Sequence, residues 1–126
     1  HKNPKANAAD LMLTTVDDYG RFAVHVLKGT GLSPAVFAEM VRPQTTYTTG
    51  KNLYFGLGWM VMPQLSNGEY ALIHTGSDPG VATVVVLFPQ SQRGLIVFTN
   101  GDNGVQVWTR IVAAAFDVGK EMLDRG

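Results

Sequence analysis

The fold class is decided by the stretch YALIHTGSDPGVATVVVLFPQSQRGLIVFT, residues 70–99. Residues 70–75 have a strand-like pattern, and the apolar, β-branched run Ala82–Phe88 predicts a buried strand. Asp78-Pro79-Gly80 between them is a turn by composition, and a short polar connection leads to a third strand over 94–99. Because short turns join strands that pair with each other, this stretch predicts an antiparallel meander.

Helices are predicted on both sides of this meander. Apolar residues at helical spacing, acidic residues in the first turn and Gly29 after the last turn predict a helix over Val16–Lys28. A second, short helix begins at Ser33-Pro34 and ends before Pro43. Residues 105–122 have nearly helical spacing and predict one long helix on a face of the sheet. The predicted fold class is therefore α+β, an antiparallel sheet flanked by helices.

The segment before the meander is less regular. Residues 44–52 contain four threonines and a glycine without a period, which predicts a loop. Residues 54–62 are rich in aromatic residues and precede a turn at Ser66-Asn67-Gly68, so they are expected to form a hairpin with the strand that follows. Their aromatic and methionine side chains are compatible with an apolar pocket, although a place in the core is the more common outcome.

Composition limits the class of protein. A chain of 126 residues with 45% apolar residues can bury the core of one domain, expected over 1–126, with a linker or truncation boundary over 1–10. Ten basic residues balance ten acidic ones, so no nucleic acid is expected as a partner. Without cysteine there is no disulfide, thiolate zinc site or thiol nucleophile. The apolar run Val81–Phe88 is too short to insert into a membrane, which takes about 20 residues.

His74-Thr75-Gly76-Ser77 is the first candidate site. An imidazole, a hydroxyl group and a glycine follow one another where a strand runs into a turn, and a strand edge offers N–H groups to a ligand. The alternative is that His74 is an ordinary, partly buried strand residue and Gly76 a bend. Spacing alone favours this alternative.

Three other segments have simpler explanations than function. Asp17-Asp18 could bind a metal, but acidic residues are common in first helical turns. Residues 100–104 have the oxygen-rich composition of a calcium loop but lack its later glutamate and full ligand spacing, so a tight turn is expected. Residues 48–51 end like a phosphate loop without its upstream glycines. No metal site is predicted.

Four segments in this order resemble the serine β-lactamase-like hydrolases, the family of class C β-lactamases and penicillin-binding-protein-like esterases. They are LMLTTVDDYGRF at 11–22, FGLGW at 55–59, IHTGSDPGV at 73–81 and GLIVFTN at 94–100. The resemblance covers almost the whole chain and places it in the C-terminal, sheet-side part of that family's fold. Four ordered matches are far more specific than any one of them.

The resemblance implies acyl-enzyme chemistry on an ester, amide or peptide substrate, without a cofactor. In the family a serine in S-x-x-K attacks a carbonyl, its lysine and the tyrosine of Y-x-N handle the proton, and a third motif, K-T-G or H-x-G, faces the serine. His74 and Gly76 match H-x-G, Thr75 fills the variable place, and Ser77 stands where the family takes one oxyanion-hole N–H. The implied catalytic residues are His74 and Ser77, and the implied substrate-binding residues are Thr75 and Gly76.

The resemblance also implies a preference among reactions and a compartment. A histidine ring is mostly neutral near pH 7, so His74 attracts a substrate carboxylate less than a lysine would. This favours esterase or peptidase-like chemistry over efficient β-lactam hydrolysis, with His74 orienting the substrate and tuning the proton network. Family habit favours a periplasmic or secreted protein, and the composition is equally compatible with the cytoplasm.

The chain departs from the family pattern at the nucleophile. No serine has lysine three residues later, and no tyrosine has asparagine two residues later. In the family these motifs come earlier in the chain, so the N-terminal part of the same protein is the expected partner, and these 126 residues alone are expected to be inactive. The alternative is a non-catalytic binding or assembly module that pairs as a homo-oligomer through apolar surface or a sheet edge.

Overall fold

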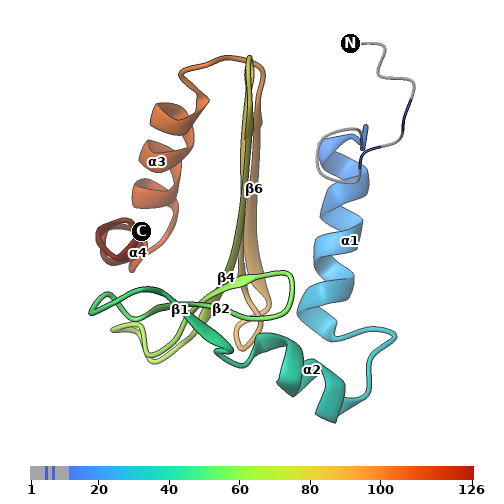
Figure 1. Ribbon diagram of the computed structural model, residues 1–126, viewed down its shortest axis with the longest axis vertical. Helices are drawn as coiled ribbons and strands as arrows, with labels where there is room; N and C mark the ends of the chain where they lie inside the picture. The colour runs from blue at the N-terminus through green and yellow to red at the C-terminus, as the bar shows by residue number, and fades with distance from the viewer. Residues whose placement is uncertain (1–4, 6, 8–11) are drawn as a thin grey trace.

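The computed structural model describes Lys5, Asn7 and residues 12–126, so most of the predicted linker over 1–10 lies outside the described residues. The described part is an α+β fold, as predicted, with a six-stranded antiparallel sheet in the order β1-β2-β3-β4-β5-β6 (Figure 1). The elements are α1 (Val16–Lys28), α2 (Pro34–Val41), β1 (Thr45–Thr48), β2 (Leu53–Phe55), β3 (Met60–Met62), β4 (Ala71–Asp78), β5 (Val81–Phe88), β6 (Arg93–Thr99), α3 (Gly104–Ala115) and α4 (Gly119–Arg125).

The sheet stands between two layers of helix. Figure 1 shows it nearly edge-on, with α1 on one side and α3 and α4 on the other. On β5, Val84, Val86 and Phe88 belong to the core under α3 and α4, whereas Val85 and Leu87 belong to the core under α1. Because helices cover both of its faces, β5 is an almost continuous apolar run. The predicted meander over β4, β5 and β6 is confirmed.

Both N-terminal helices form where their capping residues predict them. Thr15 Oγ1 accepts a hydrogen bond of 3.1 Å from the Asp18 N–H, and Gly29 ends α1 in the left-handed region at φ 63°. Ser33 Oγ accepts one of 3.2 Å from the Val36 N–H at the start of α2. The start of α1 therefore explains Asp17 and Asp18, which lie in its first turn, without a metal site.

The predicted loop over 44–52 is wrong in part, because Thr45–Thr48 is strand β1. It pairs with β2 in an antiparallel register, and the Gln44 N–H donates to the Phe55 carbonyl at 2.7 Å. Three of the four β1 residues are exposed, so this strand at the edge of the sheet has no apolar alternation for sequence to detect. Its β-branched threonines suit a strand once β2 supplies a partner.

Residues 54–62 form two strands, which corrects the prediction of one. The chain turns between β2 and β3, where the Gly56 N–H donates to the Trp59 carbonyl at 2.7 Å and Gly58 has φ 78°. A positive φ is easy for glycine, so Gly58 permits a tight turn inside the aromatic run. Two successive hairpins, β2–β3 and β3–β4, replace the expected one.

The closing segment covers one face of the sheet as predicted, but as two helices. Phe116, between α3 and α4, is extended at φ −125° and ψ 142°. Its ring packs against Phe88 at a centroid distance of 4.9 Å. A Cβ on Gly119 would lie 2.1 Å from the Val112 carbonyl oxygen, so glycine permits the close return of α4. Burial of Phe116 under the sheet breaks the helix.

Candidate functional site

The candidate segment lies on a part of β4 that has a neighbour on one side only. Strand β3 pairs with Ala71–Ile73, whereas β5 pairs with β4 from Leu72 to Asp78. The β3 pairing thus stops before His74. His74, Thr75, Gly76 and Ser77 therefore border a stretch of sheet edge that the β3 pairing does not cover.

Backbone direction decides which groups this edge offers. Thr83 Oγ1 on β5 lies 3.5 Å from the Gly76 carbonyl oxygen, so the Gly76 carbonyl faces β5. Backbone groups of successive residues in a strand point to opposite sides, so the N–H and C=O of Thr75 and Ser77 face the open edge. The Ser77 N–H is therefore available to a group lying along this edge.

Gly76 is required by its neighbour across the pair. A Cβ at this position would lie 2.7 Å from Thr83 Oγ1, closer than side-chain atoms normally approach. A side chain on residue 76 would therefore disturb the pairing that holds the Ser77 backbone. The alternative from sequence was a bend at Gly76, whereas the structure shows a regular strand residue at which a Cβ would meet Thr83 Oγ1.

His74 and Thr75 lie on opposite faces of the sheet. His74 shares the face of Leu72 and α1, and its ring meets the indole of Trp59 edge-on, with centroids 6.2 Å apart. Its Nδ1 is 3.1 Å from the Thr75 carbonyl oxygen. The side chain of His74 is exposed, which corrects the alternative of a partly buried strand histidine. Trp59, which is only 8% exposed, is the core residue beside the His74 ring.

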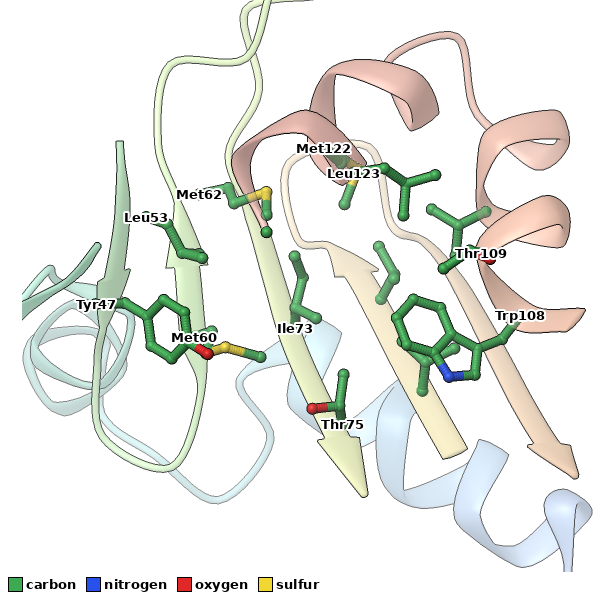
Figure 2. A pocket seen from close by; sticks show the side chains of 14 residues that line it. Tyr47, Leu53, Met60, Met62, Ile73, Thr75, Trp108, Thr109, Met122 and Leu123 are labelled. Carbon is green, nitrogen blue, oxygen red and sulfur yellow. The ribbon is translucent and has the colours of Figure 1, made fainter. Parts of the chain in front are cut away.

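Thr75 points into an apolar cavity of about 290 Å³ on the other face (Figure 2). Figure 2 shows sheet residues such as Met60 and Ile73 on one side of this cavity and Trp108 and Leu123 on the other. The lining residues are Tyr47, Leu53, Met60, Met62, Ile73, Thr75, Val84, Val86, Trp108, Thr109, Val112, Met122, Leu123 and Gly126. Met60 and Met62 line this cavity, and Met62 also belongs to the core, whereas Trp59 belongs to the core on the opposite face.

The other serines have structural places away from this edge. Ser33 caps α2, Ser66 lies in the turn between β3 and β4, and Ser91 lies between β5 and β6 and accepts a hydrogen bond from Arg93. Both turns are at the end of the sheet opposite to Ser77. Among residues 12–126, no group of three or more histidine, aspartate or glutamate side chains is placed to hold a metal ion.

Asp102 was expected only as part of a tight turn, and that turn is confirmed by the 3.0 Å bond from the Gly104 N–H to the Gly101 carbonyl. Its carboxylate also accepts a hydrogen bond of 2.6 Å from the Gly80 N–H, in the turn that follows Ser77. A contact between residues 22 positions apart leaves no local pattern, so sequence could not predict it.

The comparisons with known proteins agree with this fold. A solved structure, "The crystal structure of penicillin binding protein from Bacillus halodurans", matches with a TM-score of 0.67 and 21% sequence identity. The match covers 82% of this chain and 31% of that protein, so the chain spans about a third of its length. None of the curated proteins compared with the chain matches it.

The antiparallel sheet with helices on both faces therefore has the same fold as part of that penicillin binding protein. A family model described as Beta-lactamase matches residues 1–120. The chain belongs to the beta-lactamase family. In the described part of the chain, no helix is long and apolar enough to cross a membrane.

Proposed function

We propose that this chain is the C-terminal portion of a serine hydrolase that acts through an acyl-enzyme, with the nucleophile supplied by an N-terminal part of the same protein. One observation carries the proposal: the segment His74–Ser77, which matches the family's third motif, lies on an open strand edge toward which the Ser77 N–H points. A preorganised backbone N–H is the donor that acyl-transfer enzymes direct at an oxyanion.

The edge suggests how a substrate would lie. An extended ester, amide or peptide placed along residues 75–77 could pair with the outward backbone groups of Thr75 and Ser77, as an added strand does. Its carbonyl oxygen would accept from the Ser77 N–H, and the absence of a side chain on Gly76 keeps the pairing with β5 intact. Thr75 and Gly76 therefore act in binding.

The reaction then follows the acyl-enzyme sequence. The serine oxygen bonds to the substrate carbonyl carbon, and its proton passes through the lysine and tyrosine of the other part to the leaving oxygen or nitrogen as the bond from that atom to the carbon breaks. Water cleaves the acyl ester in the second half. His74, exposed on the α1 face beside Trp59, orients the substrate and tunes this proton network. Histidine in place of lysine favours neutral ester or peptide substrates over β-lactams that carry a carboxylate.

The test is the intact mass of the native gene product before and after incubation with a fluorophosphonate probe. We expect a mass well above 13.6 kDa and one probe adduct on a serine outside the present 126 residues. Family habit leads us to propose export to the periplasm or medium, which fractionation of the source cells would check in the same preparation. A product without a reactive serine would contradict the proposal.

The second candidate is a non-catalytic binding or assembly module, favoured by the absence of S-x-x-K and Y-x-N from these 126 residues. This candidate predicts a native product near 13.6 kDa without an adduct, forming homo-oligomers through apolar surface or a sheet edge. Light scattering of that product would then find more than one copy per particle. A monomer, or hydrolysis that is lost on changing His74, counts against it.

A further inference from the structure

The loop between β6 and α3 is hydrogen-bonded to the turn between β4 and β5. The Gly80 N–H donates to Asp102 Oδ1 at 2.6 Å, and Thr99 Oγ1 donates to the Ala82 carbonyl at 2.7 Å. A Cβ on Gly104 would lie 1.8 Å from Thr99 Oγ1, so the first residue of α3 lies directly against the β5–β6 pair. The side chains of Thr99, at the end of β6, and Asp102, in the loop after it, thus bond to the start of β5 and to the β4–β5 turn.

This turn ends the least supported part of β4. The β3 pairing stops at Ile73, so residues 74–78 depend on β5 and on what holds the tip of the hairpin. Asp78 pairs with Val81 across the turn, and Gly80 has φ 78°. A hairpin end with one neighbouring strand and exposed backbone opens more easily than the interior of a sheet. The bond from Gly80 to Asp102 restrains this tip from the β6 side.

We infer that Asp102 is a positioning residue, which acts through Gly80 to hold the Ser77 N–H where it can donate to an oxyanion. The inference rests on the proposed function, because that function gives the Ser77 N–H its role. A hydrogen bond from a backbone N–H to a carboxylate is charge-assisted and short. The distance of 2.6 Å from the Gly80 nitrogen to Asp102 Oδ1 agrees with this. Catalytic donors must be held within about 0.5 Å, and a misplacement of about 1 Å can cost about 100-fold in rate.

The matched control is at the opposite end of β4. Glu121 Oε2 accepts a hydrogen bond of 3.0 Å from the Ser66 N–H in the turn between β3 and β4. Glu121→Ala therefore removes the same kind of contact, a carboxylate on a turn N–H, from the turn at the far end of the strand, together with the ion pair between Glu121 and Arg125. Any loss that comes only from weaker folding should appear in both variants.

The test compares Asp102→Ala, Asp102→Asn and Glu121→Ala in the native hydrolase. Asp102→Ala should lower kcat about 10-fold with KM changed less than about twofold, because the donor is loosened rather than removed. Asp102→Asn should keep kcat within about threefold of the unchanged enzyme, since its amide oxygen can accept the same bond. Glu121→Ala should leave kcat unchanged. A kcat in Asp102→Ala equal to that of Glu121→Ala would overturn the inference.

A second readout separates this inference from the proposed function. Backbone N–H order parameters of Ser77 and Gly80, measured by NMR on the same proteins, should fall from about 0.85 toward about 0.6 in Asp102→Ala and stay unchanged in Glu121→Ala. If the unchanged protein forms no acyl-enzyme, the proposed function fails, and the order parameters alone decide whether Asp102 positions Ser77. Unchanged order parameters at both residues would overturn the positioning role.

Discussion

At the scale of single residues, the candidate site depends on what Gly76 lacks and on where its neighbours point. Space for a side chain at residue 76 is taken by Thr83 Oγ1, and the register with β5 directs the Ser77 N–H outward. His74 and Thr75 project to opposite faces of the sheet, toward Trp59 and the apolar cavity respectively. The space at Gly76 and the direction of the Ser77 N–H are therefore set by the pairing with β5 and not by the residues alone.

The short distance between a Cβ at residue 76 and Thr83 Oγ1 predicts that the effects of Gly76→Ala and Thr83→Ala on stability are coupled. Gly76→Ala should destabilise the protein by about 1–2 kcal/mol, as expected for an extra methyl group in a filled space. In a Thr83→Ala background, where the hydroxyl is gone, the same change should cost less than about half as much. Urea unfolding of the four proteins measures this coupling. Equal costs in both backgrounds would show that Thr83 does not set the limit.

The proposed function predicts that His74 affects the rate of hydrolysis by the native gene product. His74→Ala should lower kcat/KM for a neutral ester by about 10- to 100-fold, at or below the lower limit of about 100-fold for groups that themselves transfer the proton. His74→Lys should favour substrates with a carboxylate and lower their KM relative to that of the neutral ester, because lysine carries a full charge. Steady-state kinetics with a matched pair of substrates checks both changes. Unchanged kinetics in His74→Ala would remove His74 from the mechanism.

At the scale of elements, the break between α3 and α4 is caused by one aromatic ring. Phe116 is 9% exposed and packs against Phe88 with a centroid distance of 4.9 Å. Because the chain leaves the helix at this point, α4 returns to cover the end of the sheet and Met122 enters the core. The element boundary is therefore a consequence of packing, since no proline or cap marks it.

Truncation of that ring should be among the costliest changes in the chain. Phe116→Ala is expected to lower the free energy of unfolding by about 3–5 kcal/mol, the usual cost of removing a buried phenylalanine ring. Phe22→Ala, at a position that is 50% exposed on α1, is the matched control and should cost less than about 1 kcal/mol. Denaturant unfolding measures the free energy of unfolding of both variants. Similar costs for the two would contradict the role given to Phe116.

At the scale of the whole molecule, long-range polar contacts join the segment between β3 and β4 to α4. Arg125 on α4 donates to the Pro63 carbonyl at 2.7 Å, and Glu121 accepts from the Ser66 N–H and from Arg125. Hydrogen bonding from Ser66, followed by the nearby charge of Arg125, holds the pKa of Glu121 below its usual value. Glu121 therefore favours the folded state when it is ionised.

This lowered pKa predicts how stability depends on pH. Because the folded pKa lies below the unfolded value of about 4.3, the contribution of Glu121 is complete above that value and is lost as the pH falls through the folded pKa. Glu121→Gln should thus reduce stability above about pH 5 by about 1 kcal/mol and make the acid side of the stability curve flatter. Thermal melts of the unchanged protein and of Glu121→Gln from pH 3 to pH 7 measure this pH dependence of stability. Parallel curves for both proteins would contradict the prediction.

The sequence by itself determined the parts that depend on neighbours along the chain. Thr15 and Ser33 mark the starts of α1 and α2, Gly29 marks the end of α1, and the apolar run Ala82–Phe88 marks a strand buried on both faces. The ordered motifs also identified the family, and with it the candidate segment His74–Ser77, because motif spelling is a local property.

Only the tertiary structure decided the parts that depend on pairing across the sheet. Strand β1 exists because β2 pairs with it, the closing helix breaks because Phe116 meets Phe88, and Asp102 reaches Gly80 across 22 residues. The open edge beside Ser77 likewise follows from where the β3 register stops. Caps and turns act within a few residues and leave a pattern in sequence, whereas register and packing are fixed by contacts between distant residues, which no local pattern records.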